Sequence, residues 1–160
     1  MKKITVALTV KNVARDIRGV IECLLNQDCP KEIYEILVID TGSTDDTIPI
    51  LDQYQSKIRV IKTQATAGKG RFLAFKHARG EIVAQTDGDV YVPKDFVSKI
   101  LKTFQKDESI VCVRWPSLTY PDKGFFYKCM TALWDGLGAT SPLSGKGELW
   151  PGYKATKYKR

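Results

Sequence analysis

Residues 34–47, YEILVIDTGSTDDT, decide the fold class of this chain. The stretch begins as a β-rich, nearly continuous apolar run, which is typical of a strand covered on both faces of a parallel sheet. At Asp40 it passes into turn-forming residues, of which Ser43, Thr44 or Asp45 can cap a helix. A buried strand that leads directly into a helix predicts one unit of an alternating β/α fold.

The same alternation extends along the chain in both directions. We expect further strands near residues 4–10, 58–61, 81–85 and 109–115, with helices between them. The helix that opens at residues 67–70 is expected to turn four side chains inward, namely Phe72, Leu73, Phe75 and Ala78. The order βαβαβαβαβ predicts a doubly wound, mostly parallel sheet with helices on both faces and right-handed crossovers.

The pattern changes at Pro116, after which prolines, glycines and aromatic residues become dense. Residues 123–137 can form one helix, and residues 138–152 resemble a loop. We therefore predict an α/β domain over residues 1–115. An irregular, aromatic-rich region over residues 116–160 continues the same domain.

Composition narrows the class of protein. The chain has 160 residues, 43% hydrophobic and 27% charged, which is ordinary for a globular domain with a core. Its net charge of +7 suits phosphate-bearing small molecules, an anionic membrane surface or nucleic acid. No helix or strand carries a dense Lys/Arg stripe with interleaved aromatics, so we expect no nucleic-acid partner. The start of the chain does not resemble a signal peptide, and no apolar run is long enough to span a membrane. The four cysteines form no C-x-x-C pair. These features favour a cytoplasmic chain.

Polar side chains stand where three of the expected strands end: Thr9, Asp40, and the pair Asp87 and Asp89. In an open parallel sheet, ligands bind outside the carboxyl ends of the strands. The convergence of these side chains therefore predicts a ligand site at that edge. His77, the only histidine, lies away from this edge and is interpreted as structural.

The sequence Asp87-Gly88-Asp89 favours a metal site. Two carboxylates one residue apart can share a hard divalent cation, and Gly88 would leave room for a phosphate or sugar to approach the backbone. A solvated turn is the alternative interpretation, because Asp-Gly is common in turns.

Residues 68–71, Gly-Lys-Gly-Arg, open a helix and can present backbone N–H groups to an anion, with Lys69 and Arg71 beside them. The spacing matches neither a Walker A motif nor G-x-G-x-x-G. A loop with solvated charges is the alternative.

Together these residues resemble the family 2 glycosyltransferases, which have the GT-A fold. The resemblance covers residues 4 to about 115 and rests on four blocks in series: LTVKN at 8–12, VIDTGSTDDT at 38–47, the glycine-and-basic helix at 67–80, and TDGD at 86–89. The second block is very close to the family pattern V-D-D-G-S-T-D-x-T, with Thr41 in place of the usual second acidic residue.

The resemblance implies roles for five residues. Thr9 and Asp40 would contact the nucleoside, and Lys69 would lie near the nucleotide. Asp87 would face the ribose or the metal, and Asp89 would hold Mg²⁺ or Mn²⁺ on the diphosphate. The implied substrate is a nucleoside-diphosphate sugar, with a UDP-sugar as the first candidate. The implied reaction is displacement at the anomeric carbon by an acceptor hydroxyl, with inversion.

The catalytic base is the missing part of this pattern. The family usually supplies it from a downstream aspartate, often in a Glu-Asp pair, and this chain has no such pair. Asp135 and Glu148 are weak candidates, and we expect the base to lie beyond residue 160 in a longer enzyme. An alternative function is therefore a truncated nucleotide-binding module that cannot transfer. A nucleotidyltransferase is disfavoured because residues 11–15 lack a glycine-rich loop.

The acceptor is expected to be a glycan or a lipid-linked molecule. Residues 150–160 combine aromatic and basic side chains that could touch an anionic membrane on its cytoplasmic face. Alternatively, they pack on residues beyond the end of this sequence.

Overall fold

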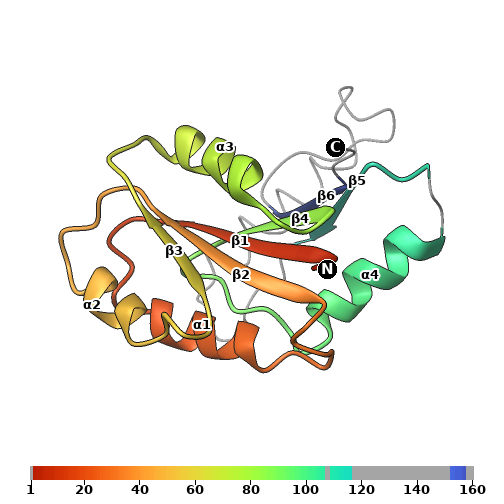
Figure 1. The fold of residues 1–160 in the computed structure, drawn as a ribbon, viewed down its shortest axis with the longest axis horizontal. Helices are drawn as coiled ribbons and strands as arrows, with labels where there is room; N and C mark the ends of the chain where they lie inside the picture. The colour runs from red at the N-terminus through yellow and green to blue at the C-terminus, as the bar shows by residue number, and fades with distance from the viewer. Residues whose placement is uncertain (1, 107–108, 117–151, 158–160) are drawn as a thin grey trace, which may run out of the picture. The chain divides into compact units, whose positions relative to one another are not determined.

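A computed structural model describes residues 2–106, 109–116 and 152–157 (Figure 1). The elements follow in the order β1 (Ile4–Val10), α1 (Ile17–Leu25), β2 (Tyr34–Asp40), α2 (Thr47–Asp52), β3 (Arg59–Lys62), α3 (Ala67–His77), β4 (Ile82–Asp87), α4 (Phe96–Lys106), β5 (Cys112–Pro116) and β6 (Gly152–Lys157). The predicted alternation of strands and helices is confirmed from β1 to β5. The helix expected at 123–137 and most of the loop expected at 138–152 lie outside the described residues.

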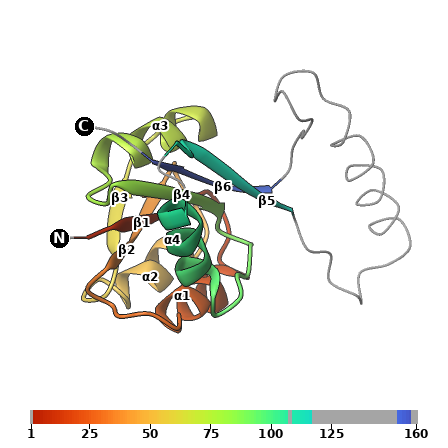
Figure 2. The same ribbon diagram turned by 90° about the vertical axis from the view of Figure 1, so that its right-hand side faces the viewer.

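The sheet is built around β1. Its strand order is β3-β2-β1-β4-β6-β5. Strand β1 pairs in parallel with both β2 and β4, and β3 pairs in parallel with β2. Figure 2 shows α3 on one face of this sheet and α1, α2 and α4 on the other, so the doubly wound architecture is confirmed.

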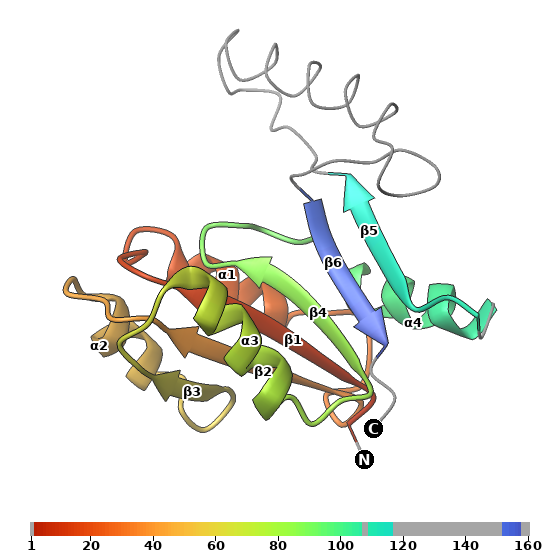
Figure 3. The same cartoon turned by 90° about the horizontal axis from the view of Figure 1, so that it is seen from above.

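Strand β6 was not predicted. It pairs antiparallel with β4, with Val83 opposite Thr156 and Ala84 opposite Ala155, and lies between β4 and β5 (Figure 3). Its sequence, GYKATK, has little apolar pattern. The strand forms because the edge of β4 offers unpaired backbone groups, and a local sequence pattern does not record that long-range partner.

Helix α3 packs on the sheet through small residues. Gly70 and Ala74 are its buried positions, and Ala78 at its C-terminal end is also buried. These three positions recur every four residues along one face of the helix. Phe72 falls on the opposite face and is 64% exposed, so the prediction that it points inward was wrong. Leu73 and Phe75 only flank the core beneath α3, which consists of Ala7, Leu37, Ile39, Ala74, Ala78 and Val83.

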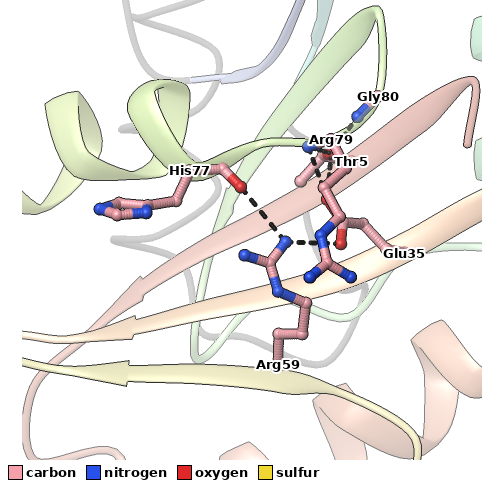
Figure 4. Close-up of polar contacts among 6 residues, drawn as sticks. All are labelled: Thr5, Glu35, Arg59, His77, Arg79 and Gly80. Carbon is pink, nitrogen blue, oxygen red and sulfur yellow. Dashed lines mark hydrogen bonds and ion pairs between the residues drawn. The ribbon is translucent and has the colours of Figure 1, made fainter.

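A buried polar network anchors the turn between α3 and β4 at the amino ends of the strands (Figure 4). The Thr5 hydroxyl donates to Glu35 Oε1 at 2.7 Å and accepts from the backbone N–H groups of Arg79 (3.1 Å) and Gly80 (2.9 Å). Glu35 Oε1 also accepts from the Arg79 N–H at 2.8 Å, and Oε2 accepts from Arg59 Nη1 at 2.8 Å. The network therefore satisfies the backbone donors of the turn inside the protein.

The Glu35 carboxylate stays charged in this network. Burial is the largest single influence and by itself would raise the pKa of Glu35. The hydrogen bonds from Arg59, Thr5 and the Arg79 backbone, together with the positive charge of Arg59, outweigh burial and hold the pKa below its usual value. Folding therefore favours the ionised form of Glu35.

Candidate functional site

The residues singled out at the strand ends lie at one edge of the sheet. Thr9 of β1 is in register with Ile39 of β2 on one side and with Asp87 of β4 on the other. Val10, the last residue of β1, is in register with Asp40. Three neighbouring parallel strands thus end together and bring Thr9, Asp40 and Asp87 to the same carboxyl edge, where α/β sheets bind ligands.

The Asp40 side chain stabilises the loop that follows β2. The Asp40 carboxylate is 2% exposed and is held by its own loop. Its Oδ1 accepts from the N–H groups of Gly42 (3.0 Å) and Ser43 (3.1 Å), and its Oδ2 accepts from the Ser43 hydroxyl. Asp40 therefore fixes the conformation of residues 41–43.

Thr41 has a structural role that its place in the sequence did not predict. Its hydroxyl and its backbone N–H both bond to the Val10 carbonyl, at 3.0 and 2.9 Å. A methyl group added at Gly70 would lie 2.7 Å from Thr41 Cγ2 and 2.6 Å from Thr9 Cγ2. Thr9 and Thr41 thus face the first turns of α3. The period of two along β2 could have found Thr41, because it puts this residue on the same face as Leu37 and Ile39.

The start of α3 is fastened to the end of β4. Thr66 caps the helix by accepting the Lys69 N–H at 3.3 Å. Arg71 Nη2 lies 3.3 Å from Asp87 Oδ1, and the Gln85 side-chain amide donates to the Arg71 carbonyl at 3.3 Å. The Arg71–Asp87 pair is substantially exposed, so it contributes at most about 1 kcal/mol and can be exchanged for a ligand at little cost.

The turn after β4 carries exposed Asp87 and Asp89 side chains. Gly88 does not leave the expected space for a ligand. A methyl group there would lie 2.6 Å from Val10 Cγ1 and 3.0 Å from Val13 Cγ2, so the protein itself fills that position. Gly88 is needed because the turn packs closely on the end of β1.

Two exposed carboxylates fit part of a divalent cation site. Hard cations such as Mg²⁺ and Mn²⁺ take oxygen ligands and commonly complete their shell with substrate phosphates and water. Within the described ranges, no group of three or more His, Cys, Asp or Glu side chains gathers at one point. The protein would therefore share the cation with a ligand rather than enclose it.

The loops beside the site are tied to each other. The Asn12 side-chain oxygen accepts from the Thr44 N–H at 2.7 Å, and the Asn12 N–H donates to the Ser43 hydroxyl at 2.9 Å. Asn12 has a positive φ of 54° and lies four residues before Asp16, the N-cap of α1, so it does not cap that helix. It joins the loops after β1 and β2 instead.

Asp45, one of the three predicted caps, accepts from the N–H of Thr47 at 3.0 Å and from the N–H of Ala14 at 3.0 Å. Hydrogen bonding by Thr47 is the largest influence and lowers the pKa of Asp45, with a further contribution from Ala14. The N-cap of α2 is Asp46, so Asp45 is not the cap residue itself, but it accepts the first N–H of that helix and holds the loop after β1.

The remaining candidates lie elsewhere. Asp135 and Glu148 fall outside the described residues. His77 ends α3, and its carbonyl accepts from Arg59 Nη1 at 3.2 Å near the amino ends of the strands. Among the helices in the part of the chain that the structure describes, none combines the length and apolar character needed to cross a bilayer.

Solved structures share this architecture. Residues 1–349 of Staphylococcus aureus TarS in complex with UDP-GlcNAc match with a TM-score of 0.66 and 28% identity, over 76% of this chain and 36% of that one. The mannosyltransferase PcManGT from Pyrobaculum calidifontis, in complex with GDP-Man and Mn²⁺, matches with a TM-score of 0.70 over 97% of this chain and 44% of that one. At 24% identity the latter likeness concerns the fold alone. The fold is of the GT-A class.

Sequence comparison identifies the family. The model for "Glycosyl transferase family 2" matches residues 5–139, and the chain belongs to that family. The poly(ribitol-phosphate) β-N-acetylglucosaminyltransferase TarS of S. aureus (strain Mu50 / ATCC 700699) is 34% identical over 100 residues. That alignment covers 59% of this chain and 18% of TarS, so the chain spans only a small part of the length of this relative.

Proposed function

We propose that this chain binds the donor in a family 2 glycosyltransferase that moves a sugar from a UDP-sugar to an acceptor hydroxyl, with inversion and with help from a divalent cation. The supporting observation is the arrangement at the carboxyl edge of the sheet. Thr9 and Asp87 are in register there, and the first turns of α3 pack directly over Thr9. A nucleotide at this edge would meet hydroxyls, a helix start and paired carboxylates together.

The nucleoside is assigned to the ends of β1 and β2. Thr9 offers a hydroxyl that faces the α3 side of the sheet, where it can contact the nucleoside. Asp40 contributes through the loop it holds, because its carboxylate already accepts three hydrogen bonds from that loop. Uridine is the base to test first, because TarS has been solved with UDP-GlcNAc.

The diphosphate is assigned to the edge where the start of α3 meets the turn after β4. Lys69 and Arg71 supply positive charge beside the helix start, where N–H groups and the helix dipole favour anions. Asp87 and Asp89 would hold Mg²⁺ or Mn²⁺ against the same phosphates. The cation supplies charge neutralisation as the nucleoside diphosphate departs.

A diphosphate also gives Arg71 a stronger partner than Asp87. The diphosphate of the donor carries two negative charges, against one for the Asp87 carboxylate, and the present ion pair is partly exposed to solvent. If Arg71 moved to the phosphate, the Asp87 carboxylate would become available to bind the cation. The exposed ion pair thus keeps both groups in place before the donor arrives.

The acceptor side is proposed from the relatives. TarS is named for transfer to poly(ribitol-phosphate), so UDP-GlcNAc with a polyol-phosphate acceptor is the first pair to assay. A glycan or lipid-linked acceptor is the wider class. The base that removes the acceptor proton is unassigned, and contact of residues 150–160 with a membrane stays a prediction.

Calorimetric titration with UDP and UDP-GlcNAc, with and without Mn²⁺, tests the proposal. We expect Asp89→Ala to remove the Mn²⁺-dependent gain in affinity, on the order of tenfold or more. The matched control is Asp95→Ala, which removes an exposed carboxylate that pairs with Lys99 on α4. Equal Mn²⁺ dependence in the Asp89 variant and the wild type would reject the cation assignment. Hydrolysis and transfer assays then separate a transferase from a module that only binds nucleotide.

A further inference from the structure

A second candidate site lies at the opposite edge of the sheet. A cavity of about 620 Å³ opens at the amino ends of β2 and β3. At this edge Ile4 of β1 is in register with Tyr34, whereas Thr9 and Asp87 meet at the other edge. Five residues of strand at about 3.3 Å each put roughly 16 Å between the two edges. The cavity is therefore separate from the proposed donor site.

The lining of this cavity is strongly cationic. Elements far apart in the sequence contribute its five basic side chains, which are Lys2, Lys31, Lys57, Arg59 and Arg79. Glu35 is the one carboxylate among the described lining residues. Both oxygens of Glu35 already accept hydrogen bonds, from Thr5, Arg79 and Arg59. Glu35 thus offsets a single positive charge, and the cavity keeps a large cationic excess.

Lys2 and Lys31 each make hydrogen bonds within the protein. The Lys2 ammonium donates to the Lys31 carbonyl at 2.6 Å, and the Lys31 ammonium donates to the Tyr34 hydroxyl at 2.9 Å. The side chains of Lys57 and Arg79 are exposed at the cavity. Arg79 enters the Glu35 network through its backbone N–H. Its guanidinium is thus the part that faces a ligand.

Arg59 is fixed in position by the same network. Its Nη1 makes both the 2.8 Å bond to Glu35 and the 3.2 Å bond to the His77 carbonyl. A guanidinium has five N–H donors in a rigid fork, so Arg59 retains others for a ligand. Arg59 and Arg79 both line the cavity. Two guanidinium groups at the wall of one cavity favour an anion inside it.

We propose that this cavity binds the phosphate group of a small phosphomonoester or phosphodiester. A phosphate group presents several oxygen acceptors and one or two negative charges in a compact volume, which matches two guanidinium groups with a lysine beside them. The volume falls in the range of small-molecule sites and exceeds what one phosphate fills, so the ligand carries a further group. The inference is independent of the proposed transferase activity.

The test is a titration with inorganic phosphate and glycerol phosphate, followed by ¹H–¹⁵N spectra of the labelled protein in saturating UDP. We expect shifts at the amides of Arg79 and Gly80, and none at those of Lys69 and Gly70. The double variant Lys57→Gln/Arg79→Gln should weaken binding by about tenfold or more. Both side chains are exposed and the Arg79 backbone N–H is retained, so the fold should persist. The matched control is Lys102→Gln, an exposed lysine on α4.

Three results would overturn the proposal. The first is equal phosphate affinity in the double variant and in Lys102→Gln, which would show that the cavity adds nothing to general charge. The second is a set of shifts confined to the start of α3. The third is a protein that does not respond to free phosphate but binds phosphatidylcholine vesicles containing phosphatidylglycerol, and that loses this vesicle binding in the double variant. That pattern would assign the cavity to a membrane surface.

Discussion

Replacement of Gly70 by alanine should force α3 away from the carboxyl edge of the sheet. The new methyl carbon would lie 2.6 Å from Thr9 Cγ2 and 2.7 Å from Thr41 Cγ2, about 1 Å inside ordinary contact distance. Thr41 cannot swing aside easily, because it is buried and its hydroxyl is bonded to the Val10 carbonyl at 3.0 Å. The strain must therefore be relieved by movement of the helix.

Gly68→Ala provides the matched control for this change. Gly68 lies in the same helix, and a methyl group there meets nothing within 4 Å. Both substitutions gain helix propensity, worth up to about 1 kcal/mol. Only Gly70→Ala incurs overpacking, which typically costs about 1–3 kcal/mol. The Gly70 variant should thus be less stable than the Gly68 variant by about 1–3 kcal/mol.

Thermal unfolding and UDP titration measure the two consequences. For a chain of this size, the stability gap corresponds to a difference in Tm of about 2–12 °C. Nucleotide affinity should fall in the Gly70 variant and stay near wild type in the Gly68 variant, because α3 carries Lys69 and Arg71 toward the proposed diphosphate position. Equal Tm values for the two variants would refute the packing argument. A lower Tm with unchanged UDP affinity in the Gly70 variant would show that the position of α3 does not affect nucleotide binding.

Two further substitutions probe the buried carboxylates at either edge. Glu35→Gln should destabilise the fold by about 1–3 kcal/mol at pH 7. Because the pKa of Glu35 is lowered in the folded protein, ionised Glu35 contributes its full share of stability above the ordinary pKa of 4.5. That contribution fades as the pH falls through the lower folded pKa. Urea unfolding should therefore show a smaller stability difference between the wild type and the variant at acidic pH. A gap that is the same at pH 7 and in acid would exclude an ionised Glu35. Asp40→Ala should weaken UDP binding severalfold in calorimetry while the fold persists, since the 41–43 loop loses three hydrogen bonds. The control is Asp46→Ala, which alters an exposed side chain. Equal UDP affinities for the two variants would show that Asp40 has no part in nucleoside binding.

Local pattern was sufficient for the first half of the sheet. The expected strand at residues 4–10 coincides with β1, and the one at 34–39 differs from β2 by a single residue. Both strands are buried on both faces, so their apolar runs reflect the packing directly. Because the strands are parallel and adjacent, the grouping of Thr9, Asp40 and Asp87 at one edge followed from their positions at the strand ends.

Side-chain direction was harder to predict. Asp40 and Thr41 stand side by side at the end of β2, yet the first bonds to its own loop and the second faces α3. A carboxylate followed by Thr-Gly-Ser has local donors within reach, and only the folded loop shows that these donors occupy it. The role of Asn12 could not be predicted for a similar reason, since its partners Ser43 and Thr44 lie more than thirty residues away.

Helix α3 explains why the two edges of the sheet can have separate chemistry. At the amino edge its end is held by the Glu35–Arg59 pair, whose carboxylate is 7% exposed and already accepts three hydrogen bonds. At the carboxyl edge its start is held by the Arg71–Asp87 pair, in which both partners are substantially exposed. Breaking the buried pair leaves an uncompensated charge, whereas breaking the exposed pair costs little. In the proposed donor complex, Arg71 can therefore leave Asp87 without loosening the helix, because the helix is secured at its far end.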